Sequence, residues 1–261
     1  MGIARKDLHF WSRRAAIAGI ETLHAVAPPI VNYSRVRFHM DTVFWQCAAH
    51  GFPLDRPRVL DPFSGSGINM SHSYLDRVET AHLCDIDQDY ARLAGNLAPN
   101  VTSIHGDSFR MLNEGDPRLG TYDLIVLDNN LGGVYYDYCE HFDAMPGVFR
   151  HFDPAAPYVV MALNFITDPE MMNADPRFET PSFEQQMERR AAFYATAARR
   201  ITPSVGAAAY AREALKEGWE VVDHALAPRA EFFHFLLLFM RRADAPVPAP
   251  TGTSRSGGSA P

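Results

Sequence analysis

The stretch Arg58-Val-Leu-Asp-Pro-Phe-Ser-Gly-Ser-Gly-Ile-Asn-Met decides the fold of this chain. It reads as a short apolar strand that ends at Asp61, a turn built on Gly65 and Gly67, and the start of a helix. Glycine has no Cβ and tolerates positive φ, so this turn lets a ligand approach the backbone closely. The free N–H groups at the start of the helix would face the same ligand. The stretch therefore predicts a nucleotide-like ligand at the end of a strand.

Two common nucleotide motifs do not fit this turn. A P-loop requires Gly-Lys-Ser/Thr, whereas Gly67 is followed by Ile68 and Asn69. A dinucleotide fingerprint requires a third small residue at the position of Met70. The turn alone therefore leaves the ligand open.

Length and composition predict one α/β domain with an appendage. The chain has 261 residues, of which 47% are hydrophobic, and this is enough for a full core. A net charge of -7 does not favour a large nucleic-acid footprint. Residues 1–40 are nevertheless basic, and they form either a solvated amphipathic helix or an arm that meets an anionic partner.

The cysteines and the apolar runs bear on location. Cys47, Cys84 and Cys139 lie far apart and match no zinc or redox motif, so we expect no metal and a reducing, cytoplasmic setting. The most apolar run, residues 232–240, is too short to span a membrane, and the N-terminus lacks an apolar signal core. We therefore expect no membrane partner.

Strand and helix patterns alternate along the chain until its last two strands. This alternation predicts an α/β fold with a doubly wound, mostly parallel seven-stranded sheet between two helical layers. No crossover helix separates the last two strands, so they must be antiparallel, with Arg229 in their connection. The strands are expected over Arg58–Asp61, Ala81–Asp85, Val101–Gly106, Tyr122–Leu127, Pro157–Phe165, Trp219–His224 and Phe232–Met240.

The helical patterns define three parts of the chain. Residues 1–52 are expected to form a helical extension or lid, residues 53–243 the main domain, and residues 244–261 a disordered tail rich in Pro, Gly and Ser. In the helix Ser182–Arg200, Met187 and Tyr194 should face inward and Arg189 and Arg190 outward. The other helices are expected over residues 7–26, 40–49, 68–76, 87–97 and 204–216.

Four predicted strands end in an acid or are directly followed by one: Asp61, Asp85, Asp107 and Asp128. Any one of them could simply cap the next helix, but ligands of open α/β sheets bind at this edge. Asp85 could accept both hydroxyls of a ribose, and Asp107 an exocyclic amine of adenine. Ile86 would offer an apolar face to the base, and Asp61 would suit a cationic group. The four acids together predict a site for a cationic nucleoside.

These residues resemble the class I S-adenosylmethionine-dependent methyltransferases over roughly residues 55 to 241. The form Asp-Pro-Phe-x-Gly-x-Gly is similar to that of enzymes that methylate nitrogen, notably exocyclic amines of adenine or cytosine in DNA and RNA. The resemblance implies S-adenosylmethionine as the cofactor, with the Gly-rich turn at its methionine part and Asp61 near the ammonium. The implied cofactor-binding residues are Asp61, Phe63, Gly65, Ser66, Gly67, Asp85, Ile86, Asp107, Ser108 and Asp128.

The chain departs from this pattern after the fourth strand. The nitrogen methyltransferases have Asp/Asn-Pro-Pro-Tyr/Phe there, whereas this chain has Asp128-Asn129-Asn130-Leu131. The departure leaves a polar pocket floor that can hold an N–H or O–H nucleophile. The candidate catalytic residues are Asp128, Asn129, Asn130, Tyr135 as a wall of the substrate pocket, and His141 (or its neighbour Glu140) as a base. For Tyr135 and His141 a packing role is the alternative.

The predicted function is methyl transfer to a small molecule, at a nitrogen, by SN2 displacement in a biosynthetic pathway. The alternative is an RNA or DNA base methyltransferase that uses the basic N-terminal segment. A third candidate binds S-adenosylmethionine but transfers its aminocarboxypropyl group or cyclises it. The sequence leaves the oligomeric state open, and a homodimer is compatible with it.

Overall fold

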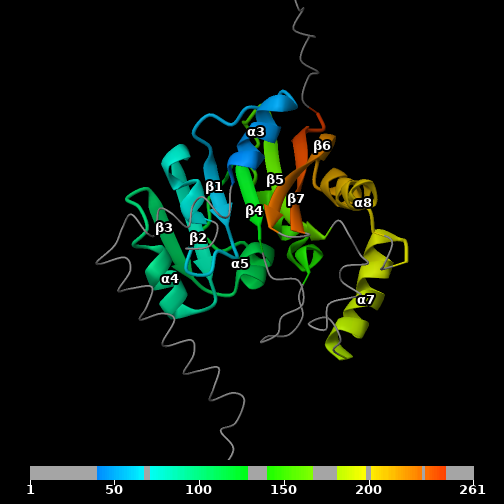
Figure 1. The fold of residues 1–261 in the computed structure, drawn as a ribbon, viewed down its shortest axis with the longest axis horizontal. Helices are drawn as coiled ribbons and strands as arrows, with labels where there is room; N and C mark the ends of the chain where they lie inside the picture. Colours follow the sequence, from blue (N-terminus) through cyan, green and yellow to red (C-terminus); the bar gives the residue numbers. More distant parts are fainter. Residues whose placement is uncertain are drawn as a thin grey trace, which may run out of the picture.

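One seven-stranded sheet forms the centre of the molecule (Figure 1). The computed structural model describes residues 40–67, 71–128, 140–166, 181–197, 201–230 and 233–244. The strand order is β3-β2-β1-β4-β5-β7-β6, and β7 runs antiparallel to both β5 and β6. The predicted sheet with its antiparallel final pair is therefore confirmed. The strands are β1 Arg58–Asp61, β2 Thr80–Asp85, β3 Val101–His105, β4 Leu124–Leu127, β5 Val159–Ile166, β6 Trp219–Ala230 and β7 Phe233–Arg242.

Helices cover both faces of the sheet, so the predicted three layers are also confirmed. One face packs against α3 (Asp41–Ala49), α4 (Gln88–Ala94) and the 3-10 turns η1 (Ser71–Ser73) and η2 (Leu75–Arg77). We call this side the α3 face. The opposite side, the α8 face, carries α5 (Ser108–Glu114), η3 (His141–Ala144), η4 (Gly147–His151), α7 (Pro181–Tyr194) and α8 (Pro203–Lys216).

The central strand β4 shows why the sheet is buried on both sides. All four of its residues are apolar and fully buried. Leu124 and Val126 pack on the α3 face, whereas Ile125 and Leu127 pack on the α8 face. Such a continuous apolar run is typical of a parallel strand that has helices on both sides.

The segment after the Gly-rich turn differs from the prediction. Instead of a helix that continues to Asp76, residues 71–77 form the short turns η1 and η2. Ser, His and Tyr in this segment are modest helix formers. The side chains of Ser71 and Tyr74 instead hydrogen-bond Asp61. These contacts favour turns over a regular helix.

Two further predictions about arginines were wrong. β6 continues to Ala230, so Arg229 lies in the strand and not in a connection. The strand passes through Pro228 because it is at the edge of the sheet, where proline is tolerated. Arg190 was expected to face outward, but it is only 4% exposed. Its burial is explained below by a buried acidic partner.

The appended segments lie largely outside the described residues. These include the predicted helix over residues 7–26 and the tail after Asp244. α3, which belongs to the predicted N-terminal extension, packs on the sheet through Val43, Phe44 and Cys47. Among the described residues, no helix combines the length and apolarity that crossing a bilayer requires.

Candidate cofactor and acceptor site

The Gly-rich turn has the backbone geometry that its sequence predicts. Gly65 and Gly67 adopt φ values of 58° and 73°, in the left-handed region that favours glycine. The amide of Gly67 donates to the Ser64 carbonyl over 2.9 Å and closes the turn. The amide of Ser64 donates to the Cys84 carbonyl over 3.1 Å, which fastens the turn to β2.

The two glycines serve different purposes. A Cβ on Gly67 would lie 2.3 Å from Cδ1 of Leu97, so this position is closed by packing. A Cβ on Gly65 would meet no atom of the described residues within 4 Å. The open side of the turn is therefore at Gly65, where a ligand can approach the backbone.

Alanine substitutions should separate these purposes. Gly65→Ala should lower the free energy of unfolding by about 1–2 kcal/mol, because only the left-handed backbone is strained. Gly67→Ala should cost more, since the methyl group must also displace Leu97. Urea denaturation of both variants measures the difference. Equal losses would show that the contact with Leu97 is unimportant.

Asp61 is a buried carboxylate at the end of β1. Its side chain is 1% exposed, and its Oδ2 accepts hydrogen bonds from the Ser71 hydroxyl (2.6 Å) and the Tyr74 hydroxyl (3.1 Å). Its Oδ1 makes no hydrogen bond of normal geometry with the described residues, although the Phe63 amide lies close enough to act on the carboxyl group. Burial, reinforced by the negative charge of Asp128, raises the pKa of Asp61 to about 7. The carboxyl group therefore changes its charge near neutral pH.

Asp85 and Ile86 lie together at the end of β2. Asp85 is half-buried, and its Oδ1 accepts the amide of Asp87 over 2.7 Å. Ile86 is 60% exposed, which is unusual for a large apolar side chain. The His105 ring contacts the Ile86 carbonyl over 3.1 Å, so the ends of β2 and β3 are joined. An acid beside an exposed apolar side chain suits a ribose and its base.

Asp107 and Ser108 hold the start of α5. Oδ1 of Asp107 accepts hydrogen bonds from the amides of Phe109 (3.0 Å) and Arg110 (3.3 Å). Asp107 is therefore the N-cap of α5. The Ser108 hydroxyl donates to the Pro62 carbonyl and joins α5 to the Gly-rich turn, where Phe63 packs on Phe109. Ser66 in the same turn is buried.

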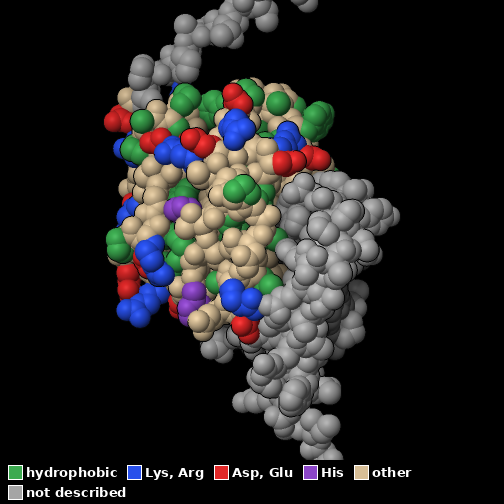
Figure 2. All heavy atoms as spheres, turned by 90° about the vertical axis from the view of Figure 1, so that its left-hand side faces the viewer, with side chains coloured by type: hydrophobic (Ala, Val, Ile, Leu, Met, Phe, Trp, Pro, Cys, Tyr) green, Lys and Arg blue, Asp and Glu red, His purple; other side chains and the backbone are tan. Residues whose placement is uncertain are grey.

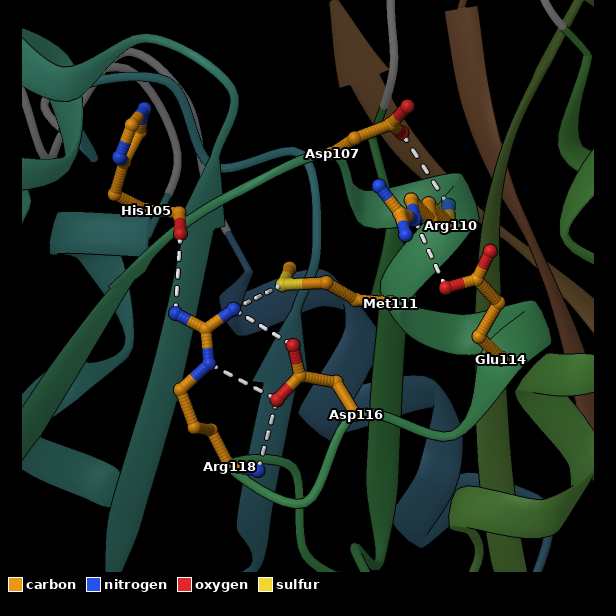
Figure 3. Close-up of polar contacts among 7 residues, drawn as sticks. All are labelled: His105, Asp107, Arg110, Met111, Glu114, Asp116 and Arg118. Atoms are coloured by element: carbon orange, nitrogen blue, oxygen red, sulfur yellow. Dashed lines mark hydrogen bonds and ion pairs between the residues drawn. The ribbon is translucent and has the colours of Figure 1, made fainter.

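Arg118 braces this corner from a loop that the sequence did not single out (Figure 3). Its guanidinium donates to the His105 carbonyl over 3.2 Å and contacts the Met111 sulfur at 3.4 Å. It is also paired with Asp116, which keeps the pKa of that carboxyl at about 2. No local sequence signal identifies Arg118, because its partners come from β3, α5 and its own loop.

Asp128 is paired with Arg229, which the sequence pattern had placed in the connection between the last two strands. The Arg229 guanidinium approaches Asp128 at two points, Nε to Oδ1 at 2.6 Å and Nη2 to Oδ2 at 3.0 Å. The Asp128 side chain is 8% exposed and that of Arg229 is 17% exposed. Burial raises the pKa of Asp128, and the charge of Arg229 opposes this rise. Asp128 is thus held in a largely buried ion pair.

Three buried polar residues, Glu140, His141 and Arg190, meet on the α8 face. Glu140 is fully buried and accepts a hydrogen bond from Nη1 of Arg190 over 2.6 Å. The ring of the adjacent His141 is hydrogen-bonded to the backbone of Leu127. Burial, together with the charge of Arg190, lowers the pKa of His141 to about 3, so its ring is neutral at physiological pH.

The structure therefore brings some predicted residues together and separates others. Asp61 and Asp128 interact on the α3 face, where Ser71 and Tyr74 complete the surroundings of Asp61. His141 belongs to η3 on the α8 face, which is the opposite side of the sheet. Asn129, Asn130 and Tyr135 lie outside the described residues.

No protein-family model and no curated protein matches this sequence. Solved structures do match. Trm1 of Pyrococcus horikoshii, solved with S-adenosyl-L-methionine, is 15% identical with a TM-score of 0.54, over 81% of this chain and 56% of that chain. TYW2 of M. jannaschii, solved with AdoMet, is 10% identical with a TM-score of 0.45, over 78% of each chain. A putative S-adenosylmethionine-dependent methyltransferase of Methanococcus maripaludis is 12% identical with a TM-score of 0.44, over 88% and 95%.

At such low identity the likeness concerns the fold, and we base it on the Trm1 structure, of whose length this chain spans just over half. The strand order and the antiparallel β7 are consistent with a Rossmann-like methyltransferase fold. This chain has the fold of the class I S-adenosylmethionine-dependent methyltransferases.

Proposed function

We propose that this chain is an S-adenosylmethionine-dependent methyltransferase. The observation that carries the proposal is the carboxyl edge of the sheet, which we call the cofactor edge. There Asp61 ends β1, Gly65 lies in the turn after it, and Asp85 ends β2. This edge fits the cofactor in two respects. Gly65 presents an open, left-handed backbone, and Asp61 offers a buried oxygen that makes no hydrogen bond of normal geometry with the described residues. A cationic amino-acid group would complement that oxygen.

The other cofactor contacts are proposed along the same edge. Asp85 holds the ribose hydroxyls, Ile86 lies against the adenine ring, and Asp107 with Ser108 lies at the adenine edge. Asp107 and Ser108 are fixed by the cap of α5 and the bond to Pro62. Bound S-adenosylmethionine would supply an electrophilic methyl group, and the chain's part is to align the acceptor with it.

The acceptor is proposed to be a small molecule that is methylated at nitrogen. Asp128 with Asn129 and Asn130 is the proposed floor of its pocket and Tyr135 its wall. His141 is buried on the opposite, α8 face and its pKa is lowered to about 3, so we assign it the packing role that was the alternative. On the surface beside β3, basic and acidic side chains are interspersed (Figure 2). Arg110 of α5 and Arg118, which bonds the end of β3, are paired with Glu114 and Asp116, and this does not favour a polyanion.

Calorimetry with S-adenosylmethionine and S-adenosylhomocysteine tests the cofactor assignment. Asp85→Ala should weaken binding by at least about 100-fold, because two charge-assisted hydrogen bonds to the ribose are lost. Asp85→Asn keeps an acceptor for the Asp87 amide and should weaken binding less.

Asp89→Ala is the matched control, since Asp89 is an exposed acid in the first turn of α4 and is paired only loosely with Arg92. It should bind like the wild type. Near-wild-type affinity of Asp85→Ala would refute the ribose assignment. Salt-sensitive binding of mixed RNA or DNA would instead favour a nucleic-acid substrate.

A further inference from the structure

Arg229 occupies a β-bulge at the edge of the sheet. The β6–β7 register passes from Pro228 opposite His234 to Ala230 opposite Phe233, so Arg229 is the extra residue of β6. Bulges of this kind re-aim a side chain at the end of a strand. The Thr42 hydroxyl of α3 donates to the Pro228 carbonyl over 3.1 Å and fixes the bulge. As a result, the arginine reaches Asp128 at the end of β4, on the α3 face.

Asp61, Asp128 and Arg229 form one charge cluster. β1 and β4 are hydrogen-bonded neighbours, and the charge of Asp128 acts on Asp61. The guanidinium contacts both oxygens of Asp128. When both acids are ionised, the cluster therefore carries one net negative charge. A ligand with a single ammonium group would neutralise it.

We propose that Arg229 is a positioning residue that keeps Asp128 ionised, so that only Asp61 loses a proton when a cationic ligand binds. The inference rests on the proposed binding of S-adenosylmethionine. Two buried acids without a cation would share one proton and titrate as a pair, with the second proton lost at a much higher pH. Arg229 thus sets the proton content of the cofactor site.

The other groups around Asp61 leave this assignment unchanged. Ser71 and Tyr74 donate hydrogen bonds from the α3 face, and burial keeps the pKa of Tyr74 well above its usual range. Cys84 on β2 also senses the charge of Asp61, and burial raises the pKa of its thiol to about 12. Neither the phenol nor the thiol titrates between pH 6 and about 9, so the two acids dominate there.

The test compares S-adenosylmethionine affinity of Arg229→Met with that of the wild type by calorimetry, from pH 6 to 9. The ligand's own amino group titrates equally with both proteins. The Kd of the variant divided by the Kd of the wild type therefore isolates the protein's contribution. This ratio should fall on the order of tenfold between pH 7 and pH 9, because the variant must release an additional proton and does so more easily at high pH.

Three variants sharpen the result. Arg229→Lys keeps the positive charge, and the double variant Arg229→Met with Asp128→Asn lacks the second acid, so both should show a ratio that does not change with pH. Arg241→Met removes the arginine of a different ion pair, which joins β7 to Glu220 of β6 at the opposite end of these strands, and should also give a constant ratio.

A constant ratio for a folded Arg229→Met protein would overturn the inference and leave the proposed function intact. If Arg229→Met does not fold, the double variant and Arg229→Lys decide, and a strong pH dependence in either would overturn it. A wild type that binds no S-adenosylmethionine would overturn the proposed function and this inference together.

Discussion

Asp61→Asn should stabilise the ligand-free protein increasingly as the pH rises. The pKa of Asp61 is raised from 3.8 to about 7 in the folded state, so the unfolded chain releases its proton first. The stability that Asp61 contributes to the wild type is therefore lost from about pH 4 upward, and the loss of this contribution is complete above about pH 7. Asparagine does not titrate, and its amide oxygen can still accept from Ser71 and Tyr74.

The size of the effect follows from the same shift. Between pH 4 and 8, the difference in free energy of unfolding between variant and wild type should grow by on the order of 2–4 kcal/mol. Urea denaturation at several pH values measures it. Asp76→Asn, at an exposed acid on η2, is the control and should change stability by less than about 0.5 kcal/mol at every pH.

Asp61→Asn should also lose affinity for S-adenosylmethionine, because the charge that faces the ammonium group is gone. A more stable protein that no longer binds its ligand would identify Asp61 as a residue kept for function at the expense of stability. If the stability difference did not grow with pH, Asp61 would not be titrating in this range.

Arg190→Met should be the most damaging single substitution at the α8 face. It removes the cation that is paired with the fully buried Glu140. Breaking such a buried pair should lower the free energy of unfolding by about 3–5 kcal/mol. Urea denaturation followed by circular dichroism gives the change in free energy of unfolding. The double variant with Glu140→Gln should recover part of the loss, since no buried charge is then left alone.

Arg189→Met is the matched control on the same helix. Arg189 is 43% exposed, pairs with Asp143 and lies 5.3 Å from the Phe142 ring centroid. An ion pair whose arginine is exposed to solvent contributes little, so this substitution should cost less than about 1 kcal/mol. Equal losses for the two arginine variants would show that Glu140 does not depend on Arg190.

Local sequence patterns predicted the features that depend on near neighbours in the chain. The run Tyr122–Leu127 predicted a central strand, observed as β4, and the missing crossover helix predicted that β6 and β7 are antiparallel. Gly65 and Gly67 predicted a left-handed turn, since few other residues adopt that backbone. These features follow from side-chain periodicity and backbone sterics within one element or two consecutive ones.

Contacts between distant residues were decided only by the tertiary structure. Arg229 meets Asp128 across 101 residues, and Arg190 meets Glu140 across 50. The first pair depends on a bulge and on the way β6 lies beside α3, and the second on how α7 packs over η3. Neither is encoded in a local pattern, so the sequence placed Arg229 in a loop and Arg190 in solvent. The sequence itself determined which acids lie at the carboxyl edge, whereas burial and the arginine partner determine the charge that each of them carries.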